Sequence, residues 1–73
     1  TGYDVWKRAD GLYEGEATAK WITFRHGFVR VRKQDWVSIL EEGWASNTER
    51  SFYVPSGHYC EVLGSCTFKF TRA

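Results

Sequence analysis

Aromatic side chains outnumber the large aliphatic ones in this chain, and this property constrains its fold more than any other. Four Trp, four Tyr and five Phe make 13 aromatic residues, against six Val, two Ile and three Leu, with no Met. Aromatic and β-branched residues favour strands over helices. Because a large aromatic side chain buries about 150–250 Å², a few of them suffice for a small core. The sequence therefore predicts an all-β protein.

The chain has 73 residues, which is the length of one small domain, and we expect residues 1–73 to form it. A core of this size gives little stability, and small domains often add a covalent link. Cys60 and Cys66 are the two cysteines, and we predict a disulfide between them, with free thiols or a metal as the alternatives. His26 and His58 do not stand at zinc-ligand spacing from this pair, so no metal site is expected.

Charge and hydropathy narrow the classes of partner. Ten basic and nine acidic residues leave a net charge of +1, which argues against a strongly basic nucleic-acid binder. No run reaches the roughly 18–20 apolar residues of a membrane-spanning helix, and no apolar run of signal type opens the chain. A small domain with a disulfide is typical of extracellular proteins. We therefore expect secretion, and Thr1 is compatible with a mature N-terminus.

Turn signals at short intervals divide the chain into strands. Asp10-Gly11 and Arg25-His26-Gly27 predict turns, the second with Gly27 in the left-handed conformation. Residues 35–43 fit either a short helix, with Asp35 as its N-cap, or a strand. The prediction is a small antiparallel sandwich or closed barrel of five to seven short strands with at most one short helix (35–43). The expected strands span 2–9, 12–24, 28–33, 52–54, 59–62 and 66–71, the last two joined as a hairpin around Leu63-Gly64.

Residues 12–24 and 28–33 are predicted to pair as a hairpin with Phe24 opposite Phe28. One face of this hairpin is apolar and is the expected core face; it holds Ala17, Ala19, Trp21, Val29 and Val31. The other face holds Lys20, Ile22, Phe24, Phe28, Arg30 and Arg32. Its basic residues suit an anionic partner, or they form a solvated face balanced by Glu14 and Glu16.

Catalytic motifs are absent from the sequence. It contains no Gly-x-Ser-x-Gly, no His-Glu-x-x-His and no Gly-rich phosphate loop. Carboxylates such as Glu14 and Glu16 could in principle serve glycoside hydrolysis, but so short a chain leaves little room for a deep cleft. We expect a protein that is not an enzyme and uses no cofactor.

Binding through exposed aromatic rings is the expected function, because flat rings beside polar groups suit the faces of sugars. The predicted aromatic contacts are Trp6, Trp44 and Tyr53, with Arg30 and Arg32 as polar partners. The alternative is a secreted enzyme inhibitor, toxin or effector that binds a protein, since Trp, Tyr and Arg are also enriched at protein interfaces.

Two stretches of the chain resemble the C-terminal β-domain of animal-type α-amylases. The first is Gly27-Phe28-Val29-Arg30-Val31 followed by Asp35-Trp36. The second is Val54-Pro55-Ser56-Gly57-His58-Tyr59-Cys60-Glu61-Val62-Leu63-Gly64 with Cys66-Thr67, where the family has Pro-x-Gly-x-Tyr-Cys-Asp-Val and a Cys that pairs with a later Cys. The resemblance covers about half the chain, but the spacing from Gly27 to Pro55 is longer and the cysteine loop shorter than in the family. It implies an all-β accessory module associated with polysaccharide.

A second resemblance is to small bacterial α-amylase inhibitor proteins, which are secreted β-sandwiches of similar length. Trp6-Lys7-Arg8 is similar in part to their Trp-Arg-Tyr recognition segment, whereas their two long-range disulfides have no counterpart here. This resemblance implies an inhibitor and supports the alternative function.

Overall fold

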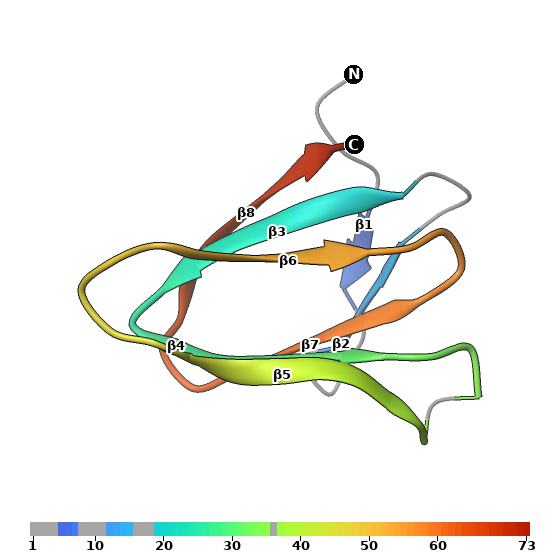
Figure 1. Ribbon diagram of the computed structural model, residues 1–73, viewed down its shortest axis with the longest axis horizontal. Helices are drawn as coiled ribbons and strands as arrows, with labels where there is room; N and C mark the ends of the chain where they lie inside the picture. Colours follow the sequence, from blue (N-terminus) through green and yellow to red (C-terminus); the bar gives the residue numbers. More distant parts are fainter. Residues whose placement is uncertain (1–4, 8–11, 16–18, 36) are drawn as a thin grey trace.

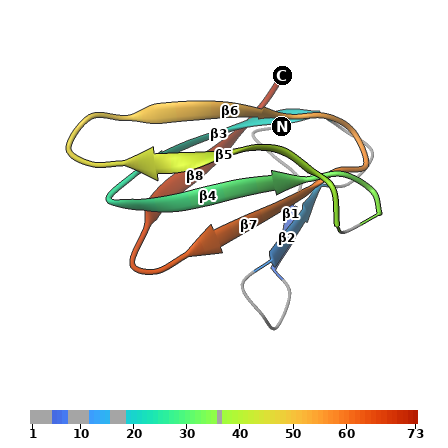
Figure 2. The same ribbon diagram turned by 60° about the horizontal axis from the view of Figure 1, so that its bottom comes forward.

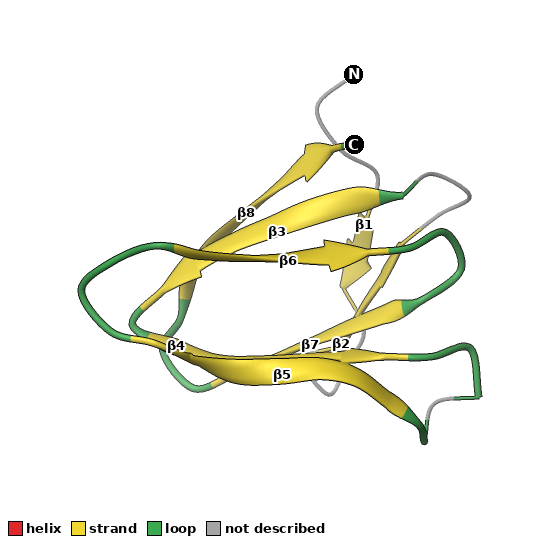
Figure 3. Cartoon of the chain, in the orientation of Figure 1, coloured by secondary structure: helices red, strands yellow, loops and turns green. Residues whose placement is uncertain are grey.

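The computed structural model describes residues 5–7, 12–15, 19–35 and 37–73, and the side chains of 19–35 and 37–73. All regular structure in these residues is strand (Figure 3). The described residues contain no helix long and apolar enough to cross a membrane. The strands are β1 (Val5–Lys7), β2 (Leu12–Gly15), β3 (Lys20–Arg25), β4 (Gly27–Arg32), β5 (Ile39–Ala45), β6 (Arg50–Val54), β7 (Tyr59–Leu63) and β8 (Thr67–Arg72).

The strands form two antiparallel sheets that pack face to face (Figure 1). The three-stranded sheet has the order β6-β3-β8, and the five-stranded sheet has the order β1-β2-β7-β4-β5. Figure 2 brings the five-stranded sheet forward and shows β5, β4 and β7 side by side. The predicted all-β antiparallel sandwich is confirmed. Residues 12–24, predicted as one strand, contain β2 and β3 in different sheets, and with the additional strand β5 the described residues form eight strands.

The predicted hairpin of residues 12–24 and 28–33 is wrong, because the chain crosses between the sheets at this point. β3 pairs with β6 and β8, whereas β4 pairs with β5 and β7. His26 is the single residue between β3 and β4, and its φ of 61° places it in the left-handed region that we expected Gly27 to occupy. The predicted hairpin around Leu63-Gly64 is wrong for the same reason, since β7 and β8 belong to different sheets.

This crossing decides which side chains enter the core. Ile22 and Phe24 on β3 point inward, as do Val29 and Val31 on β4, so the inward positions change from even to odd at His26. The predicted core face is therefore correct on β4 and reversed on β3. The buried apolar residues are Ile22, Phe24, Val29, Val31, Ala45, Phe52, Val54, Cys60 and Phe70.

Trp21 and Lys20 on β3 lie on the faces opposite to those predicted for them. Trp21, predicted in the core, is 43% exposed. Lys20, predicted on the outer basic face, is only 1% exposed and lies on the inward side. Ala19 is half-buried, and Ala17 lies outside the described residues.

Cys60 and Cys66 are free thiols in this structure, so the predicted disulfide is wrong. A hairpin around Leu63-Gly64 would bring the two residues opposite each other, but the segment instead leads from one sheet to the other. Cys60 points into the core, and Cys66 lies half-buried beside Gly27. Burial raises the pKa of both thiols, which keeps them protonated at neutral pH.

Residues 39–45 form the edge strand β5, so the helical alternative for 35–43 is wrong in this part. Asp35 nonetheless caps backbone amides, as an N-cap would, but it does so in a turn. Its Oδ1 accepts hydrogen bonds from the backbone N–H groups of Val37 and Ser38, both at 2.8 Å. The Ser38 hydroxyl donates to Oδ2 at 2.6 Å. The aspartate therefore fixes the turn that leads into β5.

These hydrogen bonds predict how the turn responds to acid. The bonds from Ser38 and Val37 lower the pKa of Asp35 from 3.8 to about 2. Because the pKa is lower in the folded state, the stability contributed by Asp35 is complete above pH 3.8 and is lost as the pH falls through about 2. We expect an NMR titration of the Asp35 carboxyl to show a midpoint near 2, and Asp35→Ala to weaken the pH dependence of unfolding below pH 4. A midpoint at the ordinary value would contradict the hydrogen bonding seen here.

Candidate ligand-binding faces

The outer face of the five-stranded sheet is organised in three rows of side chains that cross β5, β4 and β7. The pairing of the strands sets these rows, because directly opposed residues point to the same face. They are Trp44–Phe28–Leu63, Glu42–Arg30–Glu61 and Ile39–Arg32–Tyr59.

The first row presents a large aromatic ring to solvent. Trp44 is 67% exposed, and its ring stands edge-to-face against Phe28, with 5.6 Å between centroids and an interplanar angle of 71°. A shallow hollow of about 320 Å³ lies beside it. We call this region the Trp44 site; it is lined by Phe28, Arg30, Trp44, Leu63 and Gly64.

The second row is a network of ion pairs. Arg30 donates from Nε to Glu42 at 2.7 Å and from Nη1 to Glu61 at 3.2 Å. Arg32 donates from Nε to the same oxygen of Glu61 at 3.2 Å. The hydrogen bond to Glu42 raises the pKa of Arg30, and its guanidinium lies 5.3 Å from the centroid of the Phe28 ring. Two guanidinium groups thus face two carboxylates, and the network is close to neutral.

The basic residues Arg30 and Arg32 are balanced by Glu42 and Glu61, which the sequence had not indicated for this role. The predicted balance by Glu14 and Glu16 stays a prediction. The side chain of Glu14 and the whole of Glu16 lie outside the described residues.

The outer face of the three-stranded sheet carries a second aromatic pair. Trp21 and Tyr53 are directly opposed on β3 and β6 and are 43% and 40% exposed. Their rings stand edge-to-face with 5.3 Å between centroids. Further along the strands, the hydroxyls of Thr23 and Ser51 form a hydrogen bond of 2.9 Å, and Lys69 lies opposite Thr23 on β8. We call this surface the Trp21 face; it comprises Trp21, Tyr53, Thr23, Ser51 and Lys69.

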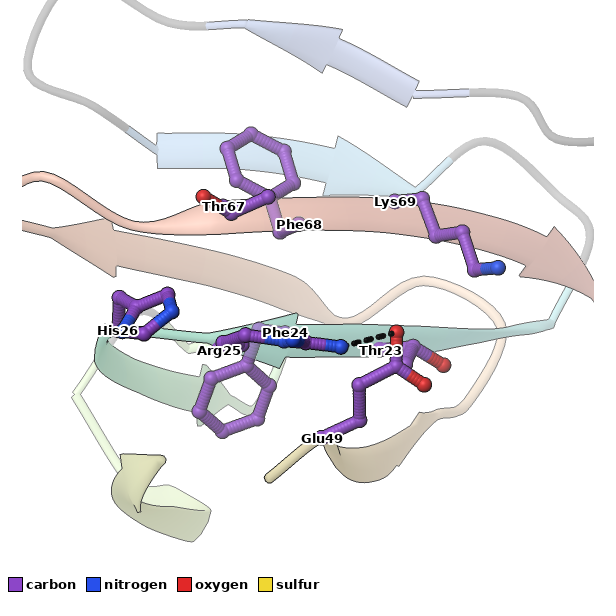
Figure 4. A pocket seen from close by; sticks show the side chains of 8 residues that line it. All are labelled: Thr23, Phe24, Arg25, His26, Glu49, Thr67, Phe68 and Lys69. Carbon is purple, nitrogen blue, oxygen red and sulfur yellow. Dashed lines mark ion pairs between the residues drawn. The ribbon is translucent and has the colours of Figure 1, made fainter. Parts of the chain in front are cut away.

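A second hollow, of about 340 Å³, continues from this face toward the end of β3 and the start of β8. Figure 4 shows Arg25 reaching across to Glu49, with which it forms an ion pair of 3.4 Å, while Lys69 lines the hollow from β8. Thr67 and His26 complete this polar end of the hollow.

The five predicted ligand residues do not form one site. Trp44, Arg30 and Arg32 lie on the outer face of the five-stranded sheet, whereas Tyr53 lies on the opposite side of the sandwich. Trp6 lies in β1, where it is paired with Glu14 of β2, and the side chain of Trp6 is outside the described part.

Sequence reasoning placed Phe28 on the same face as Arg30 and Arg32, as the structure does, but missed Leu63 beside Trp44 and Trp21 beside Tyr53. Their positions follow from strand alternation once the sheet of each strand is known. No periodicity within a single strand reveals its sheet.

Comparison of this chain with models of known protein families, with curated proteins and with solved structures found no match in any of the three.

Proposed function

We propose that this chain is a secreted, non-catalytic recognition module that binds glycan at the Trp44 site. The observation that carries the proposal is the Trp44 ring, which is two-thirds exposed and yet held in place by Phe28. An aromatic side chain fixed before binding loses little conformational entropy when a ligand arrives.

The chemistry of the site suits a sugar ring. One face of a pyranose presents C–H groups, whose partial positive charge is attracted to the negative face of an aromatic ring. The sugar hydroxyls at its rim need donors and acceptors, and Arg30 and Glu42 lie in the adjacent row. The hollow of about 320 Å³ lies at the lower end of the roughly 300–1,000 Å³ typical of ligand pockets, which suits one sugar unit on an open surface.

The charge balance of the site favours a neutral glycan. A sulfated or uronic glycan would have to compete with Glu42 and Glu61 for the guanidinium of Arg30. A neutral glycan can use the remaining donor positions without disrupting these ion pairs. The proposal therefore names neutral oligosaccharides as the ligand class.

Trp44→Ala tests the proposal directly. We expect the affinity of the Trp44 site for a neutral oligosaccharide to fall at least about 30-fold, because truncating a central aromatic contact costs about 2 kcal/mol. The unfolding free energy should change by no more than about 0.5 kcal/mol, since the ring lies on the surface. The measurement is calorimetric titration with maltohexaose, cellohexaose and chitohexaose, beside a denaturant melt.

Val37→Ala is the matched control for this substitution. It removes an aliphatic side chain that is 74% exposed and does not line the hollow, and it should leave the affinity unchanged. Equal loss in the two variants, or as many hexasaccharides bound per chain by Trp44→Ala as by the wild-type chain, would remove Trp44 from the binding site.

A protein partner is the second candidate, and the edge of the five-stranded sheet favours it. Val37, Ile39 and Leu40 are exposed apolar residues on β5 or just before it, and β5 has a paired neighbour on one side only. Unpaired backbone groups on an edge strand can accept a strand from another protein. If the chain is an inhibitor, toxin or effector that binds in this way, Leu40→Glu should abolish its affinity for the target protein. Glycan binding at the Trp44 site should be unchanged in this variant.

A further inference from the structure

We infer that the Trp21 face is a second glycan-binding surface, so that the module is bivalent and cross-links polysaccharide chains. The inference takes its ligand class from the proposed function, but the Trp21 face and the Trp44 site share no residue. The two surfaces can therefore succeed or fail separately.

The aromatic pair is the first observation. The core of the sandwich already contains Phe24, Phe52 and Phe70, yet Trp21 and Tyr53 stand on the outside, directly opposed on β3 and β6. The edge-to-face contact between them orients both rings. The two adjoining rings are inclined at 61° to each other and form an angled platform, on which each ring can contact one of two consecutive sugar units, whereas the Trp44 site exposes a single ring.

The polar groups beside the platform are the second observation. The hydrogen bond between Thr23 and Ser51 uses one proton and leaves acceptor positions and the other hydroxyl proton for a ligand. Lys69 adds an ammonium group with three donors, and none of the described side chains forms an ion pair with it. Hydroxyl and ammonium groups next to aromatic rings supply both kinds of contact that a sugar needs.

The length of the surface is the third observation. Trp21 and Arg25 lie four residues apart on β3, which corresponds to about 13 Å along an antiparallel strand. The hollow of about 340 Å³ occupies the Arg25 end of this path (Figure 4). The face thus runs from an aromatic platform to a polar hollow along one strand direction, as a surface for a short oligosaccharide would.

The arrangement of the sheets makes the two surfaces independent. The Trp44 site lies on the outer face of the five-stranded sheet, and the Trp21 face lies on the outer face of the three-stranded sheet, with the core between them (Figure 1). A short oligosaccharide on one face does not reach the other. When a polymer occupies both faces, two chains or two distant segments are joined, and this cross-links the polysaccharide.

Calorimetry with a hexasaccharide and turbidity with the matching polymer test the inference. The probes are maltohexaose with amylose, cellohexaose with hydroxyethyl cellulose, and chitohexaose with glycol chitin. We expect two hexasaccharides per wild-type chain and one per chain for Trp44→Ala or Trp21→Ala, with binding reduced at least tenfold in the double variant. Wild-type protein should make the polymer solution turbid, and each single variant should bind the polymer without turbidity.

The pattern of losses separates the two proposals. One hexasaccharide per wild-type chain, lost in Trp44→Ala and kept in Trp21→Ala, would overturn bivalence and leave the proposed function intact. Loss in Trp21→Ala alone would make the Trp21 face the single site and would overturn both bivalence and the role of Trp44. A wild-type chain that binds none of the hexasaccharides would contradict both.

Trp21→Phe separates loss of binding from loss of stability, because Trp21 also stabilises the pairing of β3 and β6 through its contact with Tyr53. Phe keeps a ring against Tyr53 and should restore stability, with only part of the affinity. If Trp21→Ala lowers the melting temperature but still binds two hexasaccharides per chain, the pair has a structural role only and the inference is wrong.

Discussion

Phe24→Ala should lower the free energy of unfolding by about 3–5 kcal/mol, as expected for removal of a fully buried phenylalanine. A domain of 73 residues is expected to have about 4–11 kcal/mol of stability in total. The substitution therefore removes a large share of that stability. Phe24 packs against Phe52 with 5.1 Å between ring centroids, and its loss leaves a cavity between β3 and β6. Urea denaturation followed by Trp fluorescence measures the effect.

Phe28→Ala is the matched control, because it removes the same side chain from the outer face of the next strand. Phe28 is only half-buried, and we expect it to lose less than half as much stability as Phe24→Ala. Equal losses would mean that β3 and β4 pair as the hairpin first predicted, with both phenylalanines on one face.

Gly27→Ala should cost about 3 kcal/mol or more, at the upper end of the penalties for overpacking. A methyl group on Gly27 would lie 2.8 Å from the backbone Cα of Cys66 and 2.7 Å from its sulfur. Backbone cannot rotate away as a flexible side chain does, so the start of β4 and the connection before β8 must separate. Thermal unfolding by circular dichroism measures the loss.

Gly64→Ala separates this clash from the strain of a glycine conformation. Gly64 has a φ of +78°, and nothing lies within 4 Å of a Cβ placed there. Its replacement should therefore cost only the left-handed strain of about 1–2 kcal/mol. Cys66→Gly in the Gly27→Ala background should recover part of the loss. If Gly27→Ala proves no more harmful than Gly64→Ala, the close approach to Cys66 is wrong.

The secondary structure was largely predictable from the sequence, whereas the pairing of the strands was not. Alternation and turn residues indicated strands near 28–33, 52–54 and 59–62, because these signals are local. A tight turn, however, looks the same whether the chain folds back as a hairpin or crosses to the facing sheet. His26 illustrates this, since the residues around it fit a three-residue hairpin loop but in fact connect two sheets.

The errors in the candidate site follow from that single ambiguity. Val29 and Val31 were correctly placed in the core, because β4 has the predicted orientation. Trp21 was wrongly placed in the core and Lys20 wrongly placed outside, because β3 has the opposite orientation. The predicted disulfide depended on the predicted hairpin around Leu63-Gly64, because only that pairing would place Cys60 and Cys66 opposite each other. Since the hairpin does not form, neither does the disulfide. Trp44 was identified without any pairing information, because its place between Gly43 and a polar loop already indicated exposure.

The crossings between the sheets also determine how this chain can fold. Among the described strands, only β1 with β2 and β4 with β5 pair with a neighbour in sequence, and every other ladder joins distant segments. Each distant ladder requires closure of a loop before its contacts form, and such topologies fold slowly, in milliseconds to seconds. We expect the β4–β5 hairpin, which holds Phe28 and Trp44 together, to form before the distant ladders. The ring pair at the Trp44 site is then expected to be in position early, and the Trp21 face to be completed only when β6 and β8 pair with β3 on either side.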